Sequence, residues 1–189
     1  MPCGSNGEPH PATTHKMKAT EYTQLRAFAR YDGAFLGIMW IVSFACSVLG
    51  AQVPLMGTLG LTFALLTPFF VVRRIRTFRD RVRDGQLSFW GGYNYSTSMF
   101  FYAALLLALA QCVFFVIIDK GHFLSNMLNQ VEQMLIASKY PEADVKASLT
   151  LMRSMRPVDW ALYFFSMNLI TGFIVSIVIA WITKRKTNQ

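Results

Sequence analysis

The sequence predicts an all-α membrane protein with four transmembrane helices, and three observations support this fold class. Hydrophobic residues make up 53% of the 189 residues and gather into long blocks instead of being scattered. Four of these blocks have the length of about 20 residues that a helix needs to cross a bilayer. The net charge of +8 arises from the segments outside those blocks. A chain of this length usually forms one domain.

The chain begins with a polar segment. Residues 1–18 are rich in Gly, Pro, Ser and Thr, a composition that predicts a disordered cytoplasmic tail. From Thr20 to Tyr31, aromatic and aliphatic residues recur at every third position, which indicates a short interfacial helix. No cleavable signal peptide is visible, because the first 33 residues are largely polar. The first apolar block should therefore act as an uncleaved targeting signal.

The predicted transmembrane helices have no charged residue in their interior. They are residues 33–51, 53–72, 96–118 and 160–182. The turn between the first two is only a few residues around Gln52, so they should form a tight antiparallel hairpin. Uncharged spans lack the ionisable groups that mark most ion and proton pathways, which disfavours an ion transporter.

Positive charge is concentrated in the loop of residues 73–95. The loop holds six arginines, which are Arg73, Arg74, Arg76, Arg79, Arg81 and Arg83. Short basic loops resist translocation and stay in the cytoplasm. Other basic residues precede the first helix, and Lys184, Arg185 and Lys186 follow the last one. Four spans place all of these segments on one side. We therefore predict that both termini are cytoplasmic, including the tail of residues 187–189, and that residues 119–159 are extracytoplasmic.

Three roles are compatible with the arginines of this loop. The first is to set the topology and contact anionic headgroups, where each basic residue contributes about 1 kcal/mol. The second is to dock an acidic or phosphate-bearing cytoplasmic partner. The third is to bind a lipid pyrophosphate, since guanidinium groups form paired hydrogen bonds with phosphate. The second helix should continue to Asp84 and stop at Gly85. The aromatic link that follows is either an interfacial turn, which we favour, or a re-entrant segment.

Residues 119–159 contain two stretches in which apolar residues recur at helical spacing, with Pro141 at the start of the second. This pattern predicts an extracytoplasmic amphipathic helical hairpin. Its apolar faces either bury against each other and the bilayer surface or form a groove for another protein. The candidate interface residues are Met127, Val131, Met134, Leu149 and Met152.

Small and neutral polar residues mark one face of the third span and one face of the fourth. They are Ala104, Ala108, Gln111, Asn168, Gly172 and Ser176. Small residues let helix backbones approach each other in a membrane. Counted from the span centres, Gln111 and Asn168 lie at nearly the same depth. We predict a packing seam closed by a hydrogen bond between these two amides, and the alternative is a substrate site.

The sequence contains no pattern that names a reaction. The motifs HExxH, CxxC and GxSxG and phosphate-binding glycine loops are absent. We therefore expect no enzyme, and we assign no catalytic residue, cofactor or metal. Asp119, His122 and Asp159 could converge in a metal or acid–base site, although helix ends that reach water explain them equally well. The charge is segregated around the membrane, so a nucleic-acid partner is not expected.

A resemblance to a known family rests on three stretches of the sequence. They are RDGQLSFWGGYNYSTSMFFYAALLLALAQ, the segment ending LMRSMRPVDW, and the last span ending in KRK. In their order and spacing these stretches resemble domain-of-unknown-function family 4199, over about Gly33 to Lys186. The resemblance implies a small four-span protein of a bacterial inner membrane, of a type typical of the Bacteroidota. That family has no established activity, so no functional residue is carried over.

Taken together, these patterns favour a non-enzymatic accessory or scaffold subunit that acts through the arginine-rich loop and the outer hairpin. The alternative is a small oligomeric transporter or lipid-handling protein. The expected partners are the phospholipid bilayer with its anionic headgroups, another membrane or envelope protein, and further copies of this chain.

Overall fold

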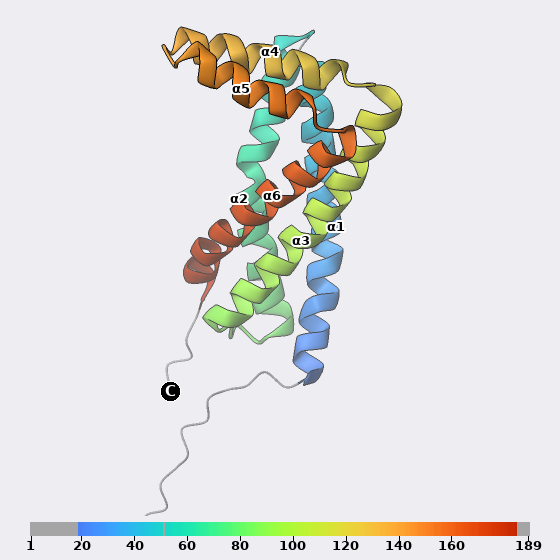
Figure 1. Ribbon diagram of the computed structural model, residues 1–189. Coiled ribbons are helices and arrows are strands. Elements are labelled where there is room, and N and C mark those ends of the chain that lie inside the picture. The colour runs from blue at the N-terminus through green and yellow to red at the C-terminus, as the bar shows by residue number, and fades with distance from the viewer. Residues whose placement is uncertain (1–18, 51, 185–189) are drawn as a thin grey trace, which may run out of the picture.

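The computed structural model describes residues 19–50 and 52–184, which form a bundle of helices without strands (Figure 1). Its α-helices are α1 (Ala19–Leu49), α2 (Pro54–Val82), α3 (Phe89–Val113), α4 (His122–Ala137), α5 (Glu142–Arg153) and α6 (Pro157–Thr183). A short π-helix, η1 (Phe114–Ile118), continues α3. The predictions for residues 1–18 and 187–189, and for Arg185 and Lys186, fall outside the described residues.

Four of the helices are long and apolar enough to cross a membrane. They are α1, α2, α3 together with η1, and α6. The bundle leaves many large apolar side chains exposed along these helices, such as Leu65, Phe69 and Ile174, which are 64%, 72% and 60% exposed. A water-soluble bundle would bury such residues, whereas a lipid-facing surface consists of them. The prediction of an all-α fold with four membrane-spanning helices is confirmed.

The helices extend beyond the apolar blocks. α1 includes the segment predicted as a separate interfacial helix, and α2 continues ten residues past the predicted span, to Val82. α3 starts at Phe89 and not at residue 96, because the Ser88 side chain caps it by accepting a hydrogen bond from the Gly91 N–H at 3.1 Å. Hydropathy marks the part of a helix that lies in lipid and not its ends. The link between α2 and α3 is therefore a short turn.

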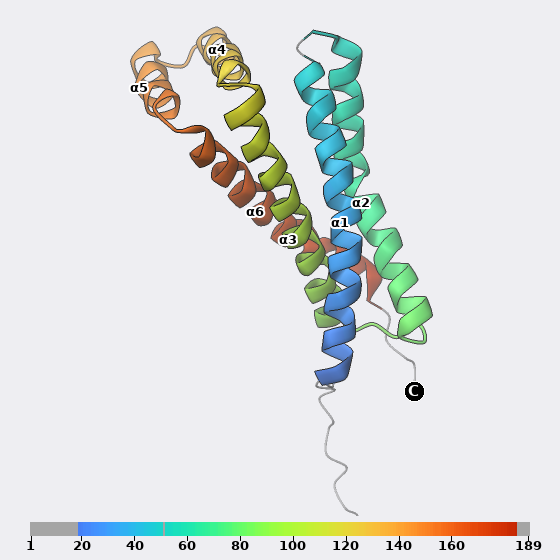
Figure 2. The same cartoon turned by 90° about the vertical axis from the view of Figure 1, so that its right-hand side faces the viewer.

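The helices pack in the order α2, α1, α3, α6. α1 packs against both α2 and α3, and α6 packs mainly against α3. Figure 2 shows the α1–α2 hairpin and the α3–α6 pair close together at one end and diverging toward the other. We call the first the basic end, because it holds the arginines of α2, and the second the far end. The two helices α2 and α6 therefore approach each other only near the basic end.

Two glycines permit close approaches of α1 and α6 to α3. A Cβ atom on Gly33 of α1 would lie 2.8 Å from the Met99 carbonyl oxygen of α3. A Cβ atom on Gly172 of α6 would lie 2.9 Å from Phe100 Cβ, also on α3. Both distances are too short for any side chain without a shift of the helices. Gly172 thus serves the packing role predicted for it.

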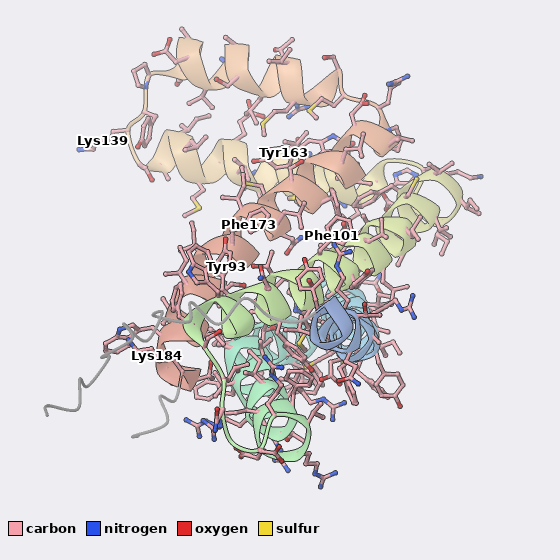
Figure 3. The ribbon with its side chains drawn as sticks, turned by 90° about the horizontal axis from the view of Figure 1, so that it is seen from below. Tyr93, Phe101, Lys139, Tyr163, Phe173 and Lys184 are labelled. Carbon is pink, nitrogen blue, oxygen red and sulfur yellow. The ribbon has the colours of Figure 1, made fainter. Side chains whose placement is uncertain are left out.

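The helices α4 and α5 lie across the far end. Their buried residues Leu124, Leu128, Val145 and Leu149 form one core with Phe115 and Trp160. Seen from the basic end (Figure 3), the α4–α5 pair projects on the side of α3 and α6, away from α1 and α2, with Lys139 at its tip. Aromatic rings join this pair to the bundle, and the centroid of Phe44 of α1 lies 6.1 Å from that of Phe123 of α4. The far end is therefore held mainly by apolar contacts.

Candidate functional site

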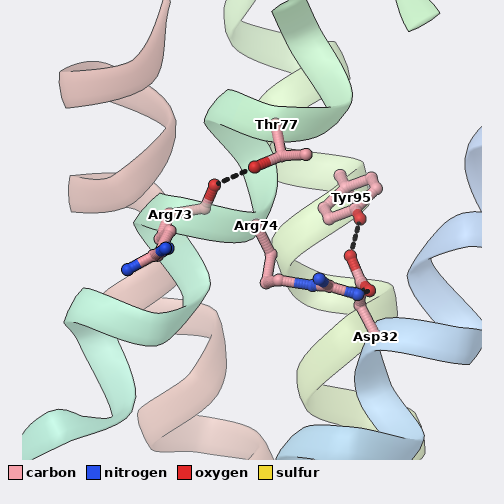
Figure 4. A network of polar contacts seen from close by, with 5 residues as sticks. All are labelled: Asp32, Arg73, Arg74, Thr77 and Tyr95. Carbon is pink, nitrogen blue, oxygen red and sulfur yellow. Dashed lines mark hydrogen bonds and ion pairs between the residues drawn. The ribbon is translucent and has the colours of Figure 1, made fainter. Parts of the chain in front are cut away.

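A buried ion pair joins three helices near the basic end (Figure 4). Asp32 of α1 is only 4% exposed, and one of its carboxylate oxygens accepts a hydrogen bond of 2.7 Å from Arg74 Nε of α2. A second guanidinium N–H of Arg74 donates to the same oxygen. The hydroxyl of Tyr95, which is fully buried in α3, donates to the other carboxylate oxygen. An unpaired carboxylate would be strongly unfavourable here, so these contacts hold α1, α2 and α3 together.

Sequence reasoning missed this cluster. The first span was predicted to start at residue 33, so Asp32 was counted with the polar flank, and Arg74, although placed on the continuing second helix, was grouped with the arginines of the cytoplasmic loop. In the structure both lie on long continuous helices. The sequence did contain a signal for this ion pair: an acid lies directly before one apolar block, and arginines lie directly after the next block. Two antiparallel helices joined by a tight turn bring such positions together.

The ion pair determines which arginines point away from the bundle core. Arg73 and Arg74 lie next to each other in α2, and Figure 4 shows them pointing to opposite sides of the helix. With Arg74 directed at α1, Arg73 and the residues three and seven positions later face α6. The buried pair thus orients a row of polar side chains, Arg73, Arg76 and Asp80, toward the last helix.

A groove of about 880 Å³ lies between α2 and α6. Its α2 side is lined by Pro68, Phe69, Val72, Arg73, Arg76, Thr77, Asp80 and Arg81. Its α6 side is lined by Ile174, Val175, Val178, Ile179 and Ile182. Along α2 the apolar residues come first and the charged residues follow, toward the basic end. The groove therefore combines an apolar channel in the membrane region with a cationic opening.

Another arginine links α2 to the end of α6. Arg79 Nε donates to Asp80 at 2.7 Å, and an Arg79 terminal N–H donates to the Thr183 carbonyl at 3.4 Å. Carbonyls at the end of a helix carry partial negative charge, which a nearby cation stabilises. Arg79 is directed at α6, whereas Arg83 caps the end of α2. Of the six predicted arginines, the groove contains Arg73, Arg76 and Arg81.

The packing seam between α3 and α6 is closed without the predicted amide pair. Asn168 Nδ2 donates to the Phe164 carbonyl at 2.8 Å within α6. Gln111 Oε1 has no hydrogen-bond partner among the described residues, so the predicted Gln111–Asn168 hydrogen bond is wrong. Ala104 and Ser176 are buried as expected for a seam, and Ala108 is half-buried.

The error came from the helix register. α3 and α6 run antiparallel, and Gly172 contacts Phe100. Asn168, one turn before Gly172 in α6, therefore lies at the level of residue 104 of α3. Gln111 is seven residues beyond that level, about 10 Å along the axis at 1.5 Å per residue. Alignment of the centres of the two predicted spans gave the wrong register, because α3 starts seven residues before its apolar block.

The acidic residues at the far end have structural partners. One Asp119 carboxylate oxygen accepts from the Phe123 N–H at 2.7 Å, at the start of α4. Asp159 accepts from Arg156 Nε at 3.0 Å, and His122 is exposed. Among the described residues, no group of three or more His, Cys, Asp or Glu could hold a metal ion. In the described part of the chain, Asp119, His122 and Asp159 therefore do not form a metal site.

The candidate interface residues of α4 and α5 divide into two sets. Leu149 is buried between the helices, and Met127 and Met152 are half-buried against the same core. Val131 and Met134 are exposed, and Met134 is 72% exposed. Burial explains the first set without a partner. A protein-binding role for the exposed residues stays a prediction.

The fold and the site by themselves define a class of protein. Four membrane-length helices with lipid-facing apolar surfaces, and a charged groove at one end, make this a multi-pass membrane protein. The chain belongs to the family described as "Protein of unknown function (DUF4199)", whose model matches residues 31–185. The family prediction is thereby confirmed. No match was found among curated proteins or among solved structures.

Proposed function

We propose that this chain is a non-enzymatic accessory protein of a bacterial inner membrane that binds an anionic phospholipid in the groove between α2 and α6. The observation that carries the proposal is the order of residues along the groove. Apolar side chains line its membrane part, and the exposed side chains of Arg73, Arg76 and Arg81 line its opening. A phospholipid has the same order, with acyl chains followed by a charged phosphate.

The orientation of the protein supports this assignment. The positive-inside rule places the basic end, and with it both termini, in the cytoplasm. The groove then opens at the level of the cytoplasmic headgroups, where anionic lipids are enriched and attract basic side chains. Arginine forms paired hydrogen bonds with phosphate oxygens. This paired geometry favours a lipid phosphate as the ligand over a surface patch of carboxylates that has no defined geometry.

A bound lipid would also complete the packing of the bundle. α2 and α6 approach each other near the basic end, and side chains of both helices line the groove between them. Acyl chains in the groove would contact Val72 and Val178 together. Binding energy therefore stabilises the arrangement in which α2 and α6 lie side by side.

Native mass spectrometry of the purified protein, released from nanodiscs that contain phosphatidylglycerol or phosphatidylcholine, tests this function. We expect retention of phosphatidylglycerol and its loss in the double variant Arg73→Gln/Arg76→Gln. At about 1 kcal/mol per arginine, affinity should fall roughly 30-fold. The matched control is Arg26→Gln/Arg30→Gln, which removes the same charge from exposed positions on α1. Equal losses in both variants would mean that net charge alone attracts the lipid.

A further inference from the structure

A second cavity lies deeper in the bundle, among α1, α2, α3 and α6. Its volume is about 340 Å³, at the lower end of the range for small-molecule sites. The residues that line it are Trp40, Ser43, Phe44, Ala64, Thr67, Pro68, Phe100, Leu107, Gln111, Asn168, Thr171, Gly172 and Val175. Pro68 and Val175 also line the groove, so the cavity adjoins the groove but is not part of it.

The cavity contains one polar group that the protein does not satisfy. Gln111 is 5% exposed, and its Oε1 atom has no hydrogen-bond partner in the described part of the chain. A buried acceptor without a partner is unfavourable, most of all in a membrane where water is scarce. In native proteins such a group calls for a specific explanation, and a role in binding a ligand is one.

Several other polar groups of the cavity are engaged within the protein. Trp40 Nε1 donates to Thr67 Oγ1 at 2.9 Å, and Ser43 Oγ donates to the Gly60 carbonyl at 2.7 Å. Asn168 Nδ2 donates within its own helix, and Thr171, which also lines the cavity, is an exposed residue. Among the described atoms that line the cavity, the fully buried polar atom without a partner is an acceptor, Gln111 Oε1, and a complementary ligand carries a hydroxyl or N–H donor.

The remaining walls restrict the ligand further. Within the described residues, no side chain that lines the cavity is charged, so an ionic ligand would have no counter-charge in a medium of low dielectric constant. The aromatic and aliphatic side chains Phe44, Phe100, Leu107 and Val175 form most of the wall. These surfaces suit a hydrocarbon body and not a polyol.

We propose that this cavity is a binding site for a neutral aliphatic molecule with a single hydroxyl or N–H donor, such as a membrane-dissolved alcohol, and that Gln111 Oε1 accepts its hydrogen bond. The site is separate from the phospholipid groove, since none of the groove arginines reaches it. The ligand reaches it from the hydrocarbon core of the bilayer, where a neutral amphiphile of this kind dissolves.

Photolabelling tests the proposal on the full chain in phosphatidylcholine nanodiscs, with an octanol that carries a diazirine as the probe. We expect saturable labelling of cavity residues, mapped by mass spectrometry. 1-Octanol should compete for the site, and octyl methyl ether, which lacks the donor, should compete about fivefold less well. Equal competition by alcohol and ether, or labelling without saturation, would overturn the proposal in favour of apolar partitioning or simple hydration of Gln111.

Two variants separate the hydrogen bond from the shape of the site. Gln111→Met keeps the side-chain volume and removes the acceptor, so probe affinity should fall about fivefold and the preference for alcohol over ether should disappear. Ala64→Trp fills the cavity from α2 and should abolish specific labelling. The control Ser166→Ala removes an exposed hydroxyl from α6 outside the cavity and should leave labelling unchanged. Undiminished labelling of Gln111→Met, with the preference for alcohol retained, would refute the role of Gln111.

Discussion

The two ends of this bundle are held by different interactions. At the basic end, directional polar contacts cross the apolar core, since Asp32 joins α1 to Arg74 and Tyr95, and Arg79 reaches the last turn of α6. At the far end, aromatic rings such as Phe44, Phe114 and Phe115 pack on one another. The polar contacts fix orientation and register, whereas ring packing permits the divergence of the two helix pairs. The groove lies at the end where orientation is fixed.

Breaking the buried ion pair should have the largest effect on stability. Asp32→Ala leaves the Arg74 guanidinium and the Tyr95 hydroxyl without their acceptor, and we expect a loss of about 4 kcal/mol. Unfolding in mixed micelles with increasing SDS, followed by tryptophan fluorescence, measures this loss. Asp144→Ala, at an exposed position of α5, should change stability by less than about 0.5 kcal/mol. A similar small change for Asp32→Ala would show that the cluster is not a structural clamp.

Truncation of the aromatic packing should cost less and act locally. Phe115 of η1 is fully buried among residues of α4 and α6, and Phe115→Ala should destabilise the protein by about 3 kcal/mol through lost packing contacts. The α4–α5 pair should then open more often, which trypsin cleavage after Lys146 of α5 reports. Cleavage there should accelerate in Phe115→Ala and stay unchanged in Asp32→Ala. Equal acceleration in both variants would mean that the two ends unfold as one unit.

The smallest expected effect concerns the close contact between α3 and α6 within one helix pair. Gly172→Ala places a methyl group 2.9 Å from Phe100 Cβ, and we expect a loss of about 1–2 kcal/mol. Gly57→Ala is the matched control, because its Cβ would lie 3.6 Å from the nearest atom, Gly50 Cα, an ordinary contact. The same unfolding assay compares the two. If Gly172→Ala were as stable as Gly57→Ala, α3 and α6 would not be closely packed at this point.

The fold could be predicted because the length of the apolar blocks by itself meets the requirement for crossing a bilayer. A helix that crosses a bilayer needs about 20 apolar residues, and four such blocks are visible in the sequence. The ends of the helices were predicted less evenly. Gly85 indicated that α2 continues through the arginines, and α2 ends at Val82, two residues before the predicted Asp84. Hydropathy did not indicate that α3 starts at Phe89 or that the Thr20–Tyr31 segment is continuous with the first span.

The candidate site was only partly predictable. The arginines were identified from charge, but their division into Arg74 and Arg79, which bind other helices, and Arg73, Arg76 and Arg81, which line the groove, depends on which helices are neighbours. Hydropathy contains no information on that order. The amides of α3 and α6 were likewise identified, and their relative depth was wrong because it depends on the register set by Gly172.

The position of the ion pair in the chain has a consequence for biogenesis. Its three members, Asp32, Arg74 and Tyr95, all precede the second half of the sequence. During translation, α1, α2 and α3 can lock together in the bilayer while α4, α5 and α6 are still unsynthesised. α6 then docks onto a finished three-helix unit, and the cleft it closes against α2 is exposed to surrounding lipid until the last moment of assembly.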